Sequence, residues 1–247
     1  RVRGSASRRY SVPLSRRAVR PLRIFLDNNF KMGHVIITTL SLAWVLLTIL
    51  ATLAVFSAVL TPKWLLGANP LEVENGTIIP TVGIFNRCTR IKGQNNCAVF
   101  AMDGLATDSS VFPSLWKVSL VLFALGLVVM VLTTMAALVS CCVQSINRKS
   151  IFTLTGTVQA AAGLFYILGL VLYAAGWGSA RVIKLCGQDA GPFTIGDCSF
   201  GWAMYIGVIG ICLTFLTACL SVCAEKTTSS DKVSRKVERG ETLVCLL

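Results

Sequence analysis

The sequence predicts an all-α membrane protein in which four transmembrane helices form a bundle. Apolar residues make up 54% of the 247 residues and charged residues only 14%, whereas soluble domains carry about 25% charged residues. Charged side chains are also absent from four long stretches, each longer than the roughly 20 residues that a helix needs to cross a bilayer. We therefore expect spans at about 33–60, 115–139, 151–176 and 200–223, within a transmembrane domain covering 33–224.

Positive charge before the first span predicts the orientation of the chain. Residues 1–31 contain nine Lys or Arg and one acid, Asp27, and such an excess beside a first span marks the cytosolic side. We predict that residues 1–32 form a basic, disordered cytosolic tail that contacts anionic lipid. Met32 is a candidate start of a shorter form. Four spans return the C-terminal tail, 225–247, to the cytosol. The net charge of +12 thus reflects the orientation of a membrane protein, and we do not expect a nucleic-acid partner. The expected location is the plasma membrane.

The first of two predicted extracellular loops, at about 61–114, carries most of the motifs. Residues 77–85 are rich in β-branched and aromatic side chains, which favours a strand. Cys88 and Cys97 lie on the oxidising side of the membrane, where thiols pair. Asn75 begins an Asn-Gly-Thr acceptor that this topology makes available for N-glycosylation, although such tripeptides often stay unused close to a membrane.

The second loop, at about 177–199, contains Cys186 and Cys198. Four luminal cysteines allow three pairings, of which local pairing within each loop is the simplest. Four tryptophans fall at the predicted luminal ends of the spans, which predicts an aromatic belt at the membrane surface: Trp64, Trp116, Trp177 and Trp202.

Small residues recur in the third and fourth spans and are expected to let these helices approach closely within the bundle. A face that recruits a partner's helix is the alternative. Cys141 and Cys142 follow the second span at its cytosolic end and are candidates for S-palmitoylation. Buried thiols in a reducing compartment are an equally good interpretation.

Catalytic chemistry is not indicated. The spans contain no ionisable pairs of the kind that transporters use, and His34, the single histidine, supports neither a catalytic triad nor a metal site. A thiol oxidoreductase prefers a Cys-x-x-Cys pair, whereas the only close pair here is Cys141-Cys142 on the cytosolic side. We expect no enzyme activity, no metal and no cofactor.

The first-loop motif resembles that of claudin-like tetraspan proteins, which is Trp, then Gly-Leu-Trp-x-x-Cys, then a second Cys. This chain has Trp64, Gly83-Ile84-Phe85 and Cys88, with Ile84-Phe85 in place of Leu-Trp. It is more similar to the LHFP-like (lipoma HMGIC fusion partner-like) tetraspan family, and its tail looks most like the type-two branch. The matching stretches include Trp64-Leu65-Leu66-Gly67, Lys149-Ser150-Ile151-Phe152, Ala175-Gly176-Trp177-Gly178 and Gly196-Asp197-Cys198-Ser199.

This resemblance implies a claudin-like four-helix bundle with a small extracellular β-sheet in the first loop, held by a Cys88–Cys97 disulfide. It also implies an auxiliary subunit that helps a membrane partner, a channel or receptor, to assemble, traffic and localise. Trp64, Gly83, Ile84 and Phe85 would set the shape of the loop that meets the partner. The alternative is a claudin-like adhesion or barrier protein that associates with itself. The charged side chains of the first loop are mixed in sign and unclustered, which disfavours an ion-selective pore.

Overall fold

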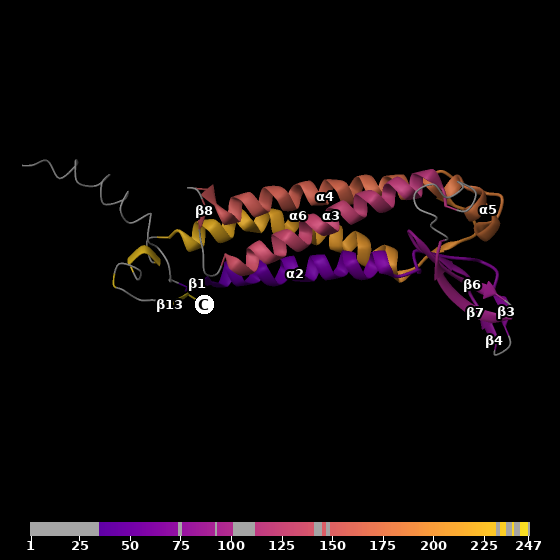
Figure 1. Ribbon diagram of the computed structural model, residues 1–247, viewed down its shortest axis with the longest axis horizontal. Helices are drawn as coiled ribbons and strands as arrows, with labels where there is room; N and C mark the ends of the chain where they lie inside the picture. The colour runs from indigo at the N-terminus through magenta and orange to yellow at the C-terminus, as the bar shows by residue number, and fades with distance from the viewer. Residues whose placement is uncertain are drawn as a thin grey trace, which may run out of the picture.

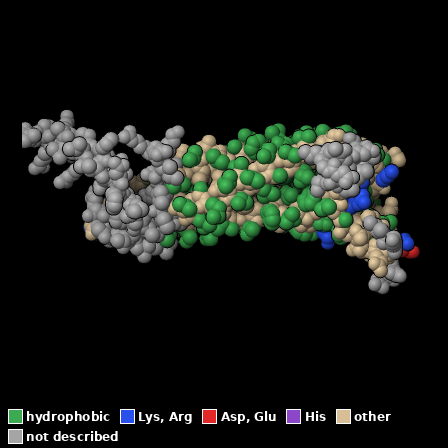
Figure 2. Space-filling view, viewed as in Figure 1, with side chains coloured by type: hydrophobic (Ala, Val, Ile, Leu, Met, Phe, Trp, Pro, Cys, Tyr) green, Lys and Arg blue, Asp and Glu red, His purple; other side chains and the backbone are tan. Residues whose placement is uncertain are grey.

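Four long helices run side by side in the computed structural model and form the body of the molecule (Figure 1). The structure describes residues 35–73, 76–91, 93–100, 112–140, 145–146, 149–230, 233–235, 239 and 243–246. Each helix is long and apolar enough to cross a membrane. Hydrophobic side chains cover the visible face of the bundle along its length (Figure 2), so the predicted four-helix membrane fold is confirmed. The helices are α2 (Thr39–Leu60), α3 (Ser114–Val139), α4 (Ile151–Ala175) and α6 (Trp202–Thr228).

Two helix ends differ from the prediction, because apolar runs and helices do not stop at the same residue. The first span was expected from residue 33, but Val35–Thr38 form strand β1 and the helix begins at Thr39. Thr38 and Ser41 form a reciprocal capping box that fixes this start. The last span also ends later than predicted, because α6 continues past residue 223 to Thr228. Backbone hydrogen bonds sustain a helix beyond its apolar stretch, so hydropathy alone misplaced its end.

Small and hydroxyl-bearing residues join the helices, as packing in lipid requires. A Cβ added at Gly210 would lie 2.7 Å from Val55 Cγ2 of α2, and one at Gly169 would lie 3.0 Å from the Phe123 ring of α3. These contacts support the packing role predicted for the glycines of the last two spans. Gln159 of α4 is fully buried and donates to Thr48 Oγ1 of α2 at 3.2 Å. The bundle interior is therefore tightly packed, with polar links between helices.

A five-stranded antiparallel sheet stands at one end of the bundle, which we call the sheet end (Figure 1). The loop between α2 and α3 supplies four strands, and the loop before α6 supplies the fifth, which was not predicted. A separate hairpin, β3 (Leu71–Val73) with β4 (Gly76–Ile78), lies in the same loop. In spatial order the sheet contains β12 (Ser199–Phe200), β2 (Leu65–Leu66), β5 (Thr81–Val82), β6 (Asn86–Ile91) and β7 (Gln94–Val99).

The prediction of one continuous strand at 77–85 is wrong. The segment divides between β4 and β5, and Gly83-Ile84-Phe85 form the turn into β6. Pro80 separates β4 from β5 because it has no N–H to donate to a ladder, although its carbonyl accepts from Gly67 N at 2.8 Å. Local β propensity therefore identified the region but not its breaks.

The loop before α6 folds back onto the sheet end. It contains a 3₁₀ turn (Gly176–Gly178), the short helix α5 (Ala180–Cys186) and a hairpin of β10 (Ala190–Gly191) with β11 (Thr194–Ile195). Helix α5 was not predicted from the sequence. Its residues Arg181, Lys184 and Leu185 line a cavity together with residues of the sheet.

Strand β1, before the first long helix, and strand β13 (Leu243–Leu246), in the C-terminal tail, lie at the opposite end of the bundle. Strand β1 pairs in parallel with β13, so the start of the first span lies beside the C-terminal tail. A second small hairpin joins β8 (Ser145–Ile146) to β9 (Lys149–Ser150). The basic tail 1–32, His34, Asn75, Cys141 and Cys142 lie outside the described residues.

The predicted aromatic belt is wrong for three of its four tryptophans. Trp64 and Trp116 are fully buried and Trp177 is 4% exposed, whereas Trp202 is 48% exposed. The three buried rings pack against other aromatic rings at the sheet end instead of facing lipid headgroups. Position at a span end does not distinguish a belt residue from a ring that joins loop and bundle.

Candidate functional site

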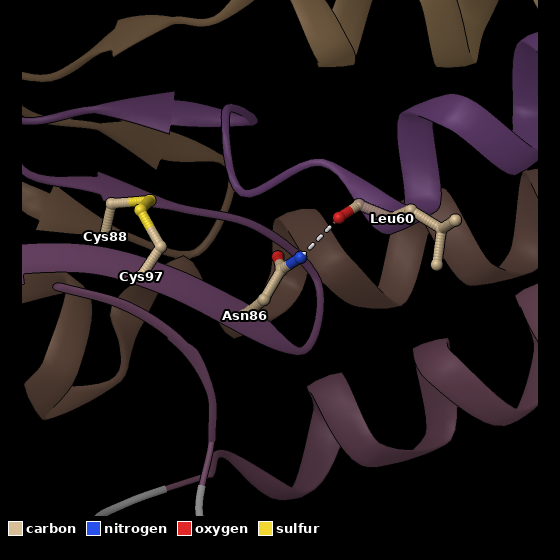
Figure 3. The surroundings of a disulfide bond; sticks show 4 residues. All are labelled: Leu60, Asn86, Cys88 and Cys97. Atoms are coloured by element: carbon tan, nitrogen blue, oxygen red, sulfur yellow. Dashed lines mark hydrogen bonds between the residues drawn. A yellow bond between two sulfur atoms is a disulfide. The ribbon is translucent and has the colours of Figure 1, made fainter.

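The sheet is attached to the bundle by side chains that cap the end of α2. The last carbonyls of a helix have no partner within it, and α2 has no basic residue in its last turn. Trp64 Nε1 donates to the Ala58 carbonyl at 2.7 Å, and Asn86 Nδ2 donates to the Leu60 carbonyl at 2.6 Å. Figure 3 shows the amide of Asn86 directed from the loop to the end of the helix. The sheet thus continues directly from α2.

Trp64 also joins three parts of the chain through its backbone and its ring. Its N–H donates to the Val82 carbonyl at 3.1 Å, and its carbonyl accepts from Gly201 N at 2.9 Å. The indole packs edge-on against Tyr173 of α4 at 5.1 Å and Phe123 of α3 at 5.8 Å between ring centroids. Such geometry is favourable for aromatic pairs. Trp64 therefore fixes the position of the sheet from inside the protein.

Gly83, Ile84 and Phe85 form the turn that leads into β6. A Cβ at Gly83 would lie 2.8 Å from the Thr61 carbonyl oxygen and 2.9 Å from Pro62 Cα, so only glycine fits against the end of α2. Ile84 is fully buried and Phe85 is partly buried against the core. These motif residues shape the loop, and its accessible surface is made by others.

Both disulfides have the local pairing expected from the sequence. Cys88 of β6 pairs with Cys97 of β7, and Cys186 of α5 pairs with Cys198 directly before β12. The first bond crosses from β6 to the adjacent strand β7 within the hairpin that these strands form (Figure 3). The second closes the loop before α6. All four bonded cysteines therefore support the sheet end.

Strand β7 is an open edge of the sheet. It is the terminal strand, paired with β6 alone among the described strands, and all six of its residues are exposed. The Cα atoms of Cys88 and Cys97 are 4.0 Å apart, a spacing typical of a non-hydrogen-bonded pair. Because the pattern alternates, Asn95, Cys97 and Val99 direct their N–H and C=O groups away from β6. The edge therefore presents a row of backbone donors and acceptors to the surroundings.

A basic cavity lies behind the sheet, between β6 and α5. Its volume is about 380 Å³, and its charged lining residues within the described part of the chain are Arg87, Arg181 and Lys184. The Arg181 and Arg87 guanidinium carbons lie 4.8 Å and 5.9 Å from the centre of the Phe100 ring. Burial, and then repulsion by Arg87, lower the pKa of Arg181. Figure 2 shows Lys and Arg side chains gathered at this end of the molecule.

The site combines predicted residues with others that sequence reasoning missed. Trp64, Gly83, Ile84, Phe85 and the four cysteines come together at the sheet end as one assembly. Asn86 was not singled out, although it occupies an unspecified position of the motif directly after Phe85. Arg87 was judged unclustered because Arg181 and Lys184 belong to the other loop. No local signal connects these two loops. Within the described residues no group of His, Cys, Asp or Glu is arranged to hold a metal ion.

Comparisons with known proteins agree with this architecture. The family model described as "Lipoma HMGIC fusion partner-like protein" matches residues 40–223. Human LHFPL tetraspan subfamily member 2 protein is 38% identical over 228 residues, covering 87% of this chain and 100% of the relative. The member 2a protein of Danio rerio is 38% identical over 229 residues, with the same two coverages. The member 4 protein of Bos taurus is 30% identical over 111 residues, which are 44% of this chain and 43% of the relative. The chain is therefore a multi-pass membrane protein that belongs to the lipoma HMGIC fusion partner-like tetraspan family.

Proposed function

We propose that this protein is a non-enzymatic auxiliary subunit that binds a membrane partner through its sheet end and assists the partner's assembly, trafficking or localisation. The observation that carries the proposal is the open edge of β7, which is fully exposed and stands at the end of a rigidly attached sheet. Exposed edges are usually protected, because they pair readily with other chains. An edge without Pro or Lys is suited to binding an extended segment of a partner by strand addition.

The bundle supports a docking role better than a transport role. Within the described residues, the interior of the four helices contains aromatic rings, hydroxyls and the amide of Gln159, and no ionisable carboxylate or amine. Transporters bind cargo with intramembrane ionisable groups or broken helices, whereas these four helices are continuous. We infer that the bundle anchors the sheet in the plasma membrane, with the sheet extracellular and both termini cytosolic.

The test is to purify the tagged protein from its own cells in a mild detergent and to identify associated proteins by mass spectrometry. Asn95→Pro removes an N–H that faces the open edge and spares the β6–β7 ladder. We expect this variant to lose a stoichiometric membrane partner. Asn95→Ala is the matched control, since it changes the same side chain but keeps the N–H, and it should retain the partner.

Two outcomes would contradict the proposal. Equal partner recovery with Asn95→Pro and Asn95→Ala would mean that the edge is not the docking surface. Recovery of the wild-type protein alone, or only with copies of itself, would favour the claudin-like adhesion function instead. A change in transepithelial resistance on expression would then be the next measurement.

A further inference from the structure

The basic cavity behind the sheet contains cations that lack a counter-charge among the described residues. Arg87 comes from β6, and Arg181 and Lys184 come from α5, one turn of helix apart. The remaining lining residues are neutral, and none of the described acids, such as Glu72 or Asp189, lines the cavity. Two loops that are distant in sequence thus place three positive charges around one space.

The position of Arg181 is energetically unfavourable in the protein without a bound ligand. Its Nε is buried without a hydrogen-bond partner among the described residues, and its guanidinium shares the Phe100 ring with that of Arg87. The lowered pKa of Arg181 reflects the same burial and repulsion. A buried donor without an acceptor and two neighbouring like charges both destabilise the folded state. An anion in the cavity would remove both penalties, which distinguishes this cluster from a solvated basic surface.

The residues that line the cavity indicate which class of anion it can bind. Leu71, Pro80, Val82 and Leu185 make much of the wall, so the ligand needs an apolar part as well as a negative end. The fork of an Arg side chain matches a carboxylate in size and shape. Anionic lipid headgroups are concentrated on the cytosolic leaflet, opposite to the side proposed here for the sheet. A carboxylate side chain with its aliphatic stem fits better than a phosphate headgroup.

We propose that the cavity lined by Arg87, Arg181 and Lys184 binds an Asp or Glu side chain from an acidic segment of the membrane partner. This inference rests on the proposed function and names a second contact for the same partner. Arg87 lies on β6, the strand that pairs with the open edge β7. The sheet would therefore offer its edge to the partner's backbone and its basic cavity to a side chain.

The first test measures binding of a fluorescent oligoglutamate peptide to the purified full-length protein in neutral detergent by fluorescence anisotropy. Wild-type protein should bind it more tightly than the matched oligoglutamine peptide. Arg181→Gln should weaken binding by about tenfold or more, as expected for a lost charged hydrogen bond. Arg90→Gln is the matched control, because Arg90 is exposed on β6 and does not line the cavity. It should change the affinity by less than about twofold.

Thermal unfolding without peptide separates a binding defect from a folding defect. Arg181→Gln removes a repelled, unsatisfied cation, so its midpoint should rise above that of the wild type. Equal losses of binding in Arg181→Gln and Arg90→Gln, or stronger competition by inorganic phosphate than by glutamate, would overturn the carboxylate site. So would tighter peptide binding by Asp103→Asn/Asp108→Asn, which would indicate that the chain's own acids occupy the cavity.

Partner recovery distinguishes failure of this inference from failure of the proposed function. Arg181→Gln should lower recovery of the partner, and Arg90→Gln should not. If Asn95→Pro loses the partner while Arg181→Gln retains it, docking on the edge stands and the cavity contact is wrong. If the wild type recovers no partner but binds oligoglutamate through Arg181, the auxiliary-subunit function is wrong and the carboxylate site stands.

Discussion

Asn86 shows how one side chain connects the membrane helices to the sheet. Its backbone carbonyl accepts from Gly83 N at 2.8 Å, and its amide donates to the last carbonyl of α2. The side chain is 8% exposed, so water does not readily replace it at Leu60. Gly83 makes room for this amide, because a Cβ at Gly83 would collide with Asn86 Oδ1.

Replacing Asn86 by Ala should destabilise the protein by about 1–3 kcal/mol, because the Leu60 carbonyl would lose its donor in a buried place. Thermal unfolding of the purified protein measures the loss, and hydrogen exchange should localise the loosening to the sheet end. Asn95→Ala provides the control: Asn95 is exposed on β7, and its removal should change stability by less than about 0.5 kcal/mol. An Asn86→Ala protein as stable as the control would show that water or a shifted backbone replaces this cap.

Residues that act through their neighbours in sequence could be predicted, and residues that act across the fold could not. Trp64 and the Gly83–Phe85 turn were identified from a local motif. The structure adds that Trp64 is an interior anchor and not a belt residue. The roles of Asn86, Arg181 and Gln159 depend on contacts with other helices or loops. No spacing along the chain encodes such contacts.

At the scale of elements, the four helices were predictable because each contains a long stretch that lacks charge. The hydrocarbon core imposes this requirement on each span independently of its neighbours. Local β propensity indicated one strand of the sheet, at 77–85, and the rest of the sheet was predictable only through the family resemblance. Strand β12 contributes two residues from a distant loop, and β1 pairs with the C-terminal β13. Strands this short have little local signal, and their existence depends on long-range pairing.

The β6–β7 hairpin should depend on its disulfide, whereas the helices should not. The Cys88–Cys97 bond closes a short loop within the β6–β7 hairpin, and its removal is expected to cost about 2–4 kcal/mol. Cys88→Ser/Cys97→Ser should therefore retain far-UV helicity but reach the cell surface poorly, as measured by surface biotinylation. Cys212→Ser changes an exposed thiol of α6 and should be delivered normally. Normal delivery of the double variant would contradict a structural role for the bond.

The molecule has two parts along its length, a helix bundle and a sheet at one end of it. Glycines and buried hydroxyls pack the helices of the bundle closely, and the two side-chain caps on α2 connect the bundle to the sheet. The two loops meet at one end through the β12–β2 pair and the aromatic rings, while strands β1 and β13 pair at the other (Figure 1). The proposed docking function needs such an arrangement, because a docking surface positions a partner only if it does not move relative to the membrane.

This arrangement also makes a prediction about orientation. Strands β1 and β13 lie side by side at the end of the bundle opposite the sheet, so we expect both termini to be on one side of the membrane. The basic residues of 1–31 predict that this side is the cytosol. Antibodies to tags at either end should therefore stain cells only after permeabilisation.

Asn75 belongs to the loop that carries the sheet, and Asn75→Gln should abolish a mobility shift that is sensitive to peptide N-glycosidase. Asn95→Gln is the control, because Asn95 is in no Asn-x-Ser/Thr tripeptide, and it should leave the mobility shift unchanged. Staining of either tag in intact cells would place the sheet in the cytosol. There its disulfides would be exposed to reduction, and both the docking surface and the carboxylate site would face the wrong compartment for a partner's extracellular domain.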